Sequence, residues 1–135
     1  MKIKDVLTLT ADRYTSGEYL WKRGVLDGPA GERCIAAGIA TTVGLMGRLA
    51  KGYDADMHNL AAPVAEHLRT LHDACQNCSP LATIVSWNDQ VGRSMADVIA
   101  ALRAGAARPS ADVDWAPTPH PDWPALDRQP APSAA

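Results

Sequence analysis

The stretch SWNDQVGRSMADVIAALR, residues 86–103, decides the fold that this sequence predicts. Trp87 is followed by an Asn-Asp pair, which favours turns, and then by Gly92, which tolerates a left-handed backbone. Ser94 with Asp97 three positions later resembles a capping box, the signal of a helix start. The stretch therefore predicts a corner between a helix that ends near Trp87 and another that begins at Ser94.

We interpret Trp87 as a buried anchor of this corner. Ile84 precedes it by three positions and points to the same side of a helix, so both side chains can cover the seam between the two helices. Aromatic side chains carry a large share of the buried area of a core. The alternative, a tryptophan that stacks on a ligand, stays open.

Apolar residues recur at helical spacing in three further segments, about residues 3–14, 33–51 and 56–75. Ser79-Pro80 is a helix-start signal for a short segment that ends at the corner. We therefore expect an all-α protein, a compact bundle of about five helices. Any β structure should be confined to a glycine-rich loop or small hairpin near residues 19–31, with Asp27-Gly28 as its turn.

The segment 33–51 is rich in small residues, with glycines at positions 38, 44 and 47. Glycine within a helix costs up to about 1 kcal/mol relative to alanine. Several of them indicate a helix against which another backbone packs closely, at the centre of the fold. In the segment 56–75, Pro63 should either kink the helix or mark its first turn.

The overall composition is that of a soluble globular protein. The chain has 135 residues, of which 47% are hydrophobic and 21% charged, and one domain is expected. The net charge of −2 gives no argument for binding nucleic acid or an anionic membrane. The sequence lacks a signal peptide and an apolar run of the roughly 20 residues that span a bilayer. Three cysteines do not suit a disulfide framework, so we expect a cytoplasmic protein with reduced thiols.

Composition changes near residue 108, which divides the chain into a helical domain, 1–107, and a tail, 108–135. The tail holds seven of the 10 prolines and much alanine, so it should be extended and contribute little to the core. It also contains Trp115 and Trp123, which are costly to expose and are therefore candidate partner-binding residues. A solvated low-complexity tail is the alternative.

The motifs WKRGVLDGPAGER, CIAAGIA and IVSWNDQVGRSMADVIAAL, taken in this order, resemble a family of small proteins from actinobacteria and their phages. The matching positions are Trp21, Gly24, Cys34, Gly38, Trp87, Asn88, Asp89, Gly92, Arg93, Ser94, Asp97 and Val98. The likeness covers about residues 1–105 and excludes the tail. It implies a domain of unknown function and a phage or prophage origin, and it supplies no chemistry.

The metal-like cluster in this sequence is His72-x-x-Cys75-x-x-Cys78, to which Cys34 or His67 could add a fourth ligand. No second half-site follows it, and helical periodicity assigns Cys75 to the apolar face of the segment 56–75. A redox Cys-x-x-Cys stands at a helix start, whereas this one is expected at a helix end. We therefore expect free thiols, no metal and no cofactor.

Catalytic motifs are also missing from the sequence, because neither a Gly-x-Ser-x-Gly elbow nor a P-loop occurs. Arg33 and Arg93 each stand near an expected helix start, where free amides attract anions. Together with Asn88 and Asp89 they form the candidate ligand-binding set.

Two classes of function follow from these observations. The leading hypothesis is a small non-enzymatic binding protein, a phage or prophage accessory factor that engages a host protein through its Trp- and Pro-rich tail. The alternative is a protein that binds or sequesters a small anionic ligand or nucleotide near Arg33 and Arg93. An unrecognised hydrolase or metalloprotein comes third.

Overall fold

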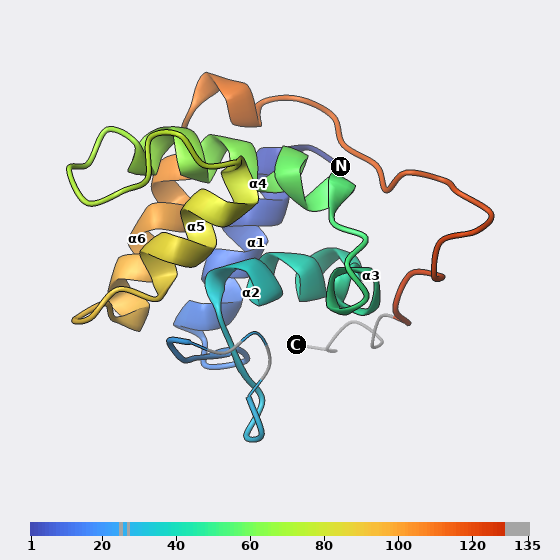
Figure 1. Cartoon of the computed structure of the whole chain (residues 1–135), viewed down its shortest axis with the longest axis horizontal. Coiled ribbons are helices and arrows are strands. Elements are labelled where there is room, and N and C mark those ends of the chain that lie inside the picture. Colours follow the sequence, from blue (N-terminus) through green and yellow to red (C-terminus); the bar gives the residue numbers. More distant parts are fainter. Residues whose placement is uncertain (25, 27, 129–135) are drawn as a thin grey trace.

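The computed structural model describes residues 1–24, 26 and 28–128, and it confirms the all-α fold (Figure 1). The helices are α1 (Ile3–Thr15), α2 (Ile35–Val43), α3 (Met46–Ala50), α4 (Ala55–Leu68), α5 (Pro80–Asn88) and α6 (Met95–Ala106). A 3-10 turn, η1 (Pro109–Ala111), follows, and two short strands, β1 (Leu20–Trp21) and β2 (Glu32–Arg33), pair with each other.

The core is formed where α1 packs along α6, and α4 packs on both α5 and α6. Helix α2 contacts α1, α4 and α5, and nearly all of its residues are buried, which confirms its central position. A Cβ atom at Gly38 would lie 2.4 Å from the hydroxyl oxygen of Tyr14, so this glycine does mark a close approach. The neighbour is a tyrosine side chain, however, and not the backbone that the sequence led us to expect.

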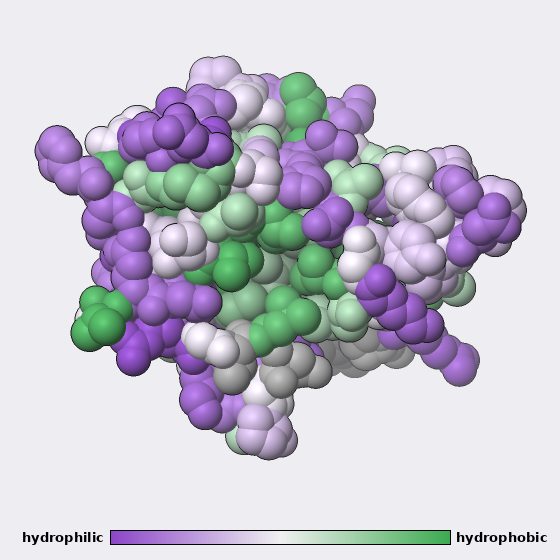
Figure 2. Space-filling view, viewed as in Figure 1, coloured by the Kyte–Doolittle hydropathy of each residue, from purple (hydrophilic) through white to green (hydrophobic). Residues whose placement is uncertain are grey.

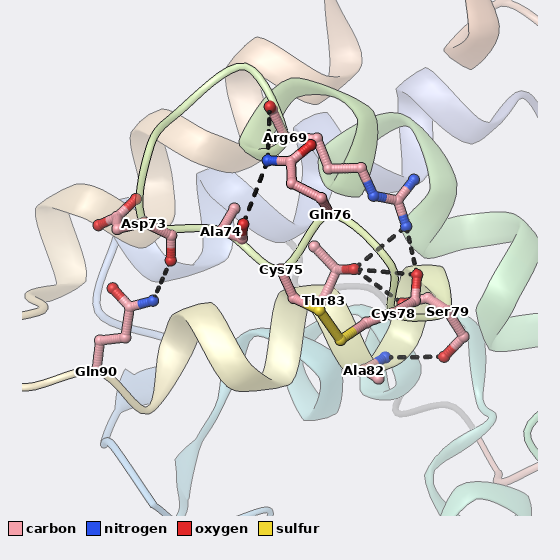
Figure 3. The surroundings of a disulfide bond; sticks show 10 residues. All are labelled: Arg69, Asp73, Ala74, Cys75, Gln76, Cys78, Ser79, Ala82, Thr83 and Gln90. Atoms are coloured by element: carbon pink, nitrogen blue, oxygen red, sulfur yellow. Dashed lines mark hydrogen bonds between the residues drawn. A yellow bond between two sulfur atoms is a disulfide. The ribbon is translucent and has the colours of Figure 1, made fainter.

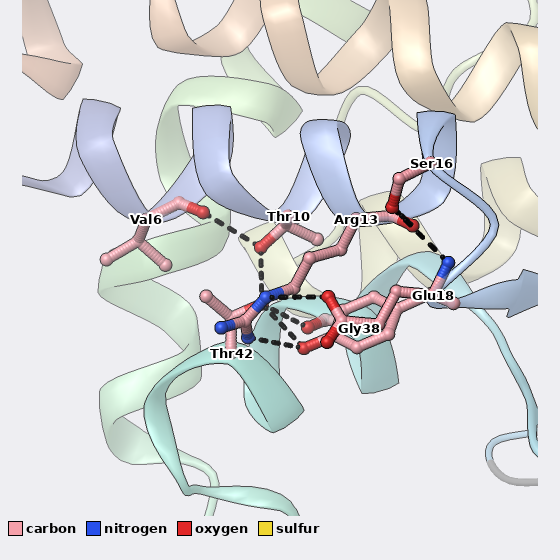
Figure 4. Close-up of polar contacts among 8 residues, drawn as sticks. Val6, Thr10, Arg13, Ser16, Glu18, Gly38 and Thr42 are labelled. Atoms are coloured by element: carbon pink, nitrogen blue, oxygen red, sulfur yellow. Dashed lines mark hydrogen bonds and ion pairs between the residues drawn. The ribbon is translucent and has the colours of Figure 1, made fainter. Parts of the chain in front are cut away.

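Two buried threonines join α1 to α2 (Figure 4). The Thr10 and Thr42 hydroxyl oxygens lie 2.8 Å apart. Thr10 also bonds to the Val6 carbonyl oxygen at 2.8 Å, and Thr42 to that of Gly38 at 2.9 Å. Because each hydroxyl has partners, these polar groups are buried without leaving an unmade hydrogen bond.

The corner has the predicted structure. Trp87 is 3% exposed at the end of α5, and Ile84 is fully buried. The capping box is complete, because the Asp97 amide donates to Ser94 Oγ at 3.2 Å and the Ser94 amide to the Asp97 carboxylate at 3.0 Å. Met95 and Leu71, by contrast, are exposed, although the periodicity assigns both to buried faces.

Two predicted helices end earlier than expected. The segment 33–51 is broken at Gly44, which takes a left-handed φ of 77° and separates α2 from α3. The segment 56–75 stops at Leu68, and Pro63 lies inside α4. Beyond Leu68, Gln76 donates its side-chain amide to the carbonyl oxygens of Arg69 and Ala74, and this competes with continued helix.

Of the two alternatives for residues 19–31, a glycine-rich loop or a small hairpin, the structure excludes the hairpin. Strands β1 and β2 run parallel, with Leu20 opposite Glu32 and Trp21 opposite Arg33. A parallel pair cannot be closed by a two-residue turn. Asp27, half of the expected turn, lies outside the described residues.

Most residues of the described part of the tail are exposed, but the tail contacts the helical domain at several points along its length. Its first part pairs with the start of the chain: the Ile3 amide donates to the Val113 carbonyl at 3.0 Å, and the Trp115 amide to that of Met1 at 2.8 Å. Residues 113–128, which we call the strap, then run from this pairing to α3 (orange to red in Figure 1).

Candidate functional site

A buried ion pair links α3 to the first turn of α4. Arg48 is 6% exposed and Asp56 is 5% exposed, and Arg48 Nη1 lies 3.6 Å from Asp56 Oδ2. Removing two charges from water costs several kcal/mol for each ion unless further hydrogen bonds compensate. Both groups therefore need hydrogen-bond partners beyond each other.

The strap supplies these partners. Arg48 donates from Nε to the Pro124 carbonyl at 2.8 Å and from Nη1 to the Thr118 carbonyl at 3.1 Å. In return, Thr118 donates to the Asp56 carboxylate from its amide at 2.9 Å and from its hydroxyl at 2.5 Å. Three of the four bonds use the main chain of the strap, so they recognise an extended backbone rather than particular side chains.

An aromatic group lies next to the ion pair. The Trp123 ring centroid is 5.5 Å from the Arg48 guanidinium carbon and 5.9 Å from the Tyr53 ring centroid. On the strap itself, His120 stacks on Trp123 with centroids 4.8 Å apart. Cation–π and ring contacts thus hold the half-buried indole at this position.

The far end of the strap is fixed at the start of α3. The Gly47 amide donates to both carboxylate oxygens of Asp127, at 3.1 and 3.2 Å, and the Asp127 amide donates to the Gly44 carbonyl at 2.8 Å. A Cβ at Gly47 would lie 2.6 Å from Asp127 Oδ1, so glycine gives the carboxylate access to the backbone. The tail groove, as we call it, comprises Gly44, Gly47, Arg48, Tyr53 and Asp56.

The two arginines singled out from the sequence bond to neighbouring protein groups. Arg33 donates to the Gly31 carbonyl at 3.0 Å and to Thr41 Oγ1 at 3.1 Å. Arg93 donates to the Trp87 carbonyl at 3.1 Å, pairs with Asp73 at 3.0 Å, and places its guanidinium carbon 3.9 Å from the Trp87 ring centroid. Arg93 lines a shallow hollow of about 340 Å³ between α4 and α6, and Arg33 is not among the residues around it.

Asn88 and Asp89 lie side by side and fasten the loop that contains β1 to the helices. Asn88 is fully buried, and its Oδ1 accepts from Trp21 Nε1 at 2.7 Å and from the Ile35 amide at 3.0 Å. Asp89 Oδ1 accepts from the Gly24 amide at 2.9 Å and from Asn88 Nδ2 at 3.1 Å. Both side chains therefore have clear structural partners.

Cys75 and Cys78 are joined by a disulfide, which corrects the expectation of reduced, free thiols. Cys34 is the free cysteine; it is 3% exposed and accepts from the Ala37 amide as the N-cap of α2. Burial raises the pKa of the Cys34 thiol. In the described part of the chain, no three His, Cys, Asp or Glu side chains are placed to hold a metal ion, and His72 is exposed.

Apolar surface gathers at the centre of the face shown in Figure 2, over α2 and α5. A small hollow of about 100 Å³ is lined by Gly24, Leu26, Cys34, Val85 and Asp89.

Among the described residues, none of the helices is long and apolar enough to cross a bilayer.

Of the two tail tryptophans, Trp115 packs against the core and Trp123 lies over Arg48 and Tyr53. Sequence reasoning missed the tail groove itself. Arg48 and Asp56 stand in no recognisable motif, and their partners lie 62 to 76 residues away along the chain.

The fold and the tail groove define a small all-α protein that holds an extended proline-rich segment against a buried ion pair. The chain belongs to a family of unknown function, DUF6197, whose model matches residues 2–108. Comparisons with curated proteins and with solved structures give no match. The matched region contains the whole tail groove and ends before the strap.

Proposed function

We propose that this protein is a non-enzymatic binding protein whose tail groove takes an extended, proline-rich segment of a partner protein. The strap occupies the groove in cis when no partner is bound. The observation that carries this proposal is the buried Arg48–Asp56 pair, whose additional hydrogen bonds come from the strap.

The chemistry of the groove is suited to recognition. Prolines at positions 117, 119, 121 and 124 favour an extended backbone, which loses little conformational entropy on docking. Arg48 and Asp56 then read two carbonyls and one amide of that backbone, while Tyr53 contacts the aromatic side chain. A partner with the same backbone form and an aromatic residue can make the same contacts.

The extent of the family match supports binding in trans. Residues 2–108 include Arg48, Tyr53 and Asp56 but exclude the strap that satisfies them. The groove thus lies inside the region that the family shares, whereas the segment that occupies it lies outside that region. We therefore infer that the occupant can be exchanged for a segment of another protein. The strap then acts as an internal competitor for partners.

A labelled peptide of residues 113–128 tests this proposal by fluorescence polarisation. In the full-length chain, the double change Thr118→Val and Asp127→Asn weakens the strap. If this raises the fraction of molecules with an open groove tenfold, the peptide should bind the variant about tenfold more tightly than the parent. Adding Arg48→Gln to the variant should abolish binding, whereas Arg103→Gln, a change at an exposed arginine that pairs with Asp12, should not.

Changes in the peptide complete the design, because they cannot alter the folding of the protein. A peptide with Val at the Thr118 position and Asn at the Asp127 position should bind about tenfold or more weakly, through loss of two charge-assisted contacts. Equal binding of both peptides, or binding that survives Arg48→Gln in a folded variant, would contradict the proposal.

We further propose that the partner is a host protein and that this protein is a phage or prophage accessory factor acting in the host cytoplasm. The likeness to small proteins of actinobacteria and their phages supports this origin. Affinity capture from an actinobacterial lysate should recover a protein with a proline-rich segment, and Arg48→Gln should abolish its capture. If the parent protein and the Arg48→Gln variant capture the same proteins, the tail groove is not the site that binds them.

The alternative, an anionic ligand held near Arg33 and Arg93, has less support. Both guanidinium groups already donate to protein oxygens, and Cys34 and Ser94 cap the two helix starts. Inorganic phosphate and nucleotides in calorimetry are the direct check of this alternative.

A further inference from the structure

The Cys75–Cys78 disulfide lies in the loop between α4 and α5, residues 69–79 (Figure 3). Both cysteines are partly exposed. The sequence interpretation placed this pair at the end of a long helix, where the dipole disfavours a thiolate. Because α4 ends at Leu68, Cys78 instead stands directly before Ser79, the N-cap of α5, at the positive end of that helix.

A second positive charge lies beside Cys78. Arg69 Nη2 donates to the Cys78 carbonyl at 2.7 Å and to Thr83 Oγ1 at 3.2 Å. Within the described residues, Arg69 has no carboxylate within 4.0 Å, in contrast to Arg93 or Arg103. An uncompensated guanidinium and a helix start both lower the free energy of a nearby thiolate.

We propose that Cys75 and Cys78 form a reversible dithiol–disulfide centre that exchanges with a dithiol of another protein. A thiolate of the reductant attacks Cys75 Sγ, the Cys75–Cys78 bond breaks, and Cys78 leaves as the thiolate stabilised by Arg69 and α5. This attack leaves a mixed disulfide between the reductant and Cys75. The second thiolate of the reductant then attacks the reductant's sulfur in the mixed disulfide and releases Cys75 as a thiolate. The reductant's dithiol becomes a disulfide, and two electrons pass to the Cys75–Cys78 pair. The two protons of the reductant's thiols end on Cys75 and Cys78.

The third thiol does not interfere with this exchange. Cys34 is buried at the start of α2, and burial raises its pKa, so it is a poor nucleophile in the folded chain. Exchange is therefore confined to the Cys75–Cys78 pair.

The loop also contacts the corner at the end of α5. Gln90 donates its side-chain amide to the Asp73 carbonyl, and the Asp73 carboxylate pairs with Arg93 at 3.0 Å. Arg93 in turn stacks on Trp87. Reduction of the disulfide therefore loosens the loop that contains Asp73, the ion-pair partner of Arg93. Because Arg93 stacks on Trp87, the environment of the Trp87 indole should change on reduction.

The experiment uses the full-length chain with Cys34→Ser, a change that replaces the sulfur acceptor at the N-cap of α2 with a hydroxyl oxygen and leaves two thiols. The folded protein is equilibrated in mixtures of reduced and oxidised dithiothreitol and then alkylated. Mass spectrometry should show that both cysteines convert together and reversibly, while the NMR signal of the Trp87 indole shifts between two positions. A disulfide that stays intact in the folded chain in excess dithiothreitol, or that does not re-form, would overturn the proposal.

The pH profile of iodoacetamide alkylation tests the assigned leaving group. In the reduced chain, Cys78 should react at a pH about one unit below that of Cys75, given the usual effect of a helix start and a cation. Arg69→Gln should move the Cys78 profile upward, and Arg69→Lys should restore it, whereas Arg103→Gln should change nothing. Circular dichroism establishes that each variant is folded. A Cys78 profile at or above that of Cys75, or one unmoved by Arg69→Gln in a folded chain, would refute the role of Cys78.

Discussion

Asn88 joins three parts of the molecule through one side chain. Its Oδ1 accepts from the indole of Trp21 in β1 and from the first amide of α2, and its Nδ2 donates to Asp89, which accepts from the Gly24 amide. Asn88 is fully buried, so its own polar atoms depend on these partners within the protein. At the scale of single residues, the stability of the corner thus depends on polar as well as apolar contacts.

Asn88→Ala should lower the free energy of unfolding by about 2–4 kcal/mol, because it leaves the buried Ile35 amide and the half-buried Trp21 indole without their acceptor. Urea denaturation followed by circular dichroism measures this change. Trp21→Phe, which removes one of the two donors, should cost less. Equal losses in both variants would show that packing, and not the amide, dominates.

Trp87→Ala should lower the free energy of unfolding by about 3–5 kcal/mol, the usual cost of deleting a large buried aromatic side chain. The variant also removes the surface on which Arg93 stacks. Thermal and urea unfolding give the magnitude. A variant as stable as the parent would mean that Trp87 does not anchor the corner.

At the scale of elements, we expect the strap to be a removable part of the fold. It is fastened at the N-terminus by backbone pairing, in the middle by the ion pair of Arg48 and Asp56, and at its far end by Asp127. Apart from Ala111, the buried apolar residues of the described core lie before residue 108, and Trp115 packs against them from the tail. Loss of the strap should therefore expose one surface without dissolving the bundle.

A chain that ends at Arg108 should keep its helix content and lose about 2–4 kcal/mol of stability, the scale of one half-buried indole and several hydrogen bonds to charged groups. Far-UV circular dichroism measures the helix content of the shortened chain, and the midpoint of urea unfolding measures its loss of stability. If the shortened chain is unfolded, the strap closes the core, and the trans-binding proposal has to be tested in longer chains only.

Acid should loosen the pairing between the N-terminus and the start of the strap, beside which Lys2 pairs with Asp112. Hydrogen bonding with Lys2 lowers the pKa of Asp112 from its usual 3.8, so the folded form binds this proton less readily than the unfolded form. Its contribution is present above pH 3.8 and is lost as the pH falls through the lowered value. The Trp115 amide signal should broaden or shift in that range, and Asp112→Asn should remove this step while leaving other acid transitions in place.

At the scale of the whole molecule, local signals in the sequence predicted where helices begin. Ser79-Pro80 and Ser94 with Asp97 act on neighbouring amides, so their effect is visible within a few residues. Where helices end was harder to predict. Gly44 breaks one apolar pattern, and the loop after Leu68 is held by Gln76, whose effect depends on how the chain returns.

The candidate site could not be read from the sequence for the same reason. The contacts of Arg48 are made with Thr118 and Pro124, and a single charged residue in a helix gives no sign of such distant partners. The tail tryptophans did point to docking, although the domain itself proved to be their neighbour. Chemistry that depends on long-range contacts becomes visible only with the fold.

The packing of α1 along α6 has a consequence for synthesis of the protein. About 80 residues separate the end of α1 from the start of α6, which at 5–20 residues per second is a delay of roughly 4–16 seconds on the ribosome. During that interval the face of α1 that carries Val6 and Leu7 has no α6 to cover it. The nascent chain should therefore be bound by chaperones that recognise apolar helices, and it should be released once α6 emerges.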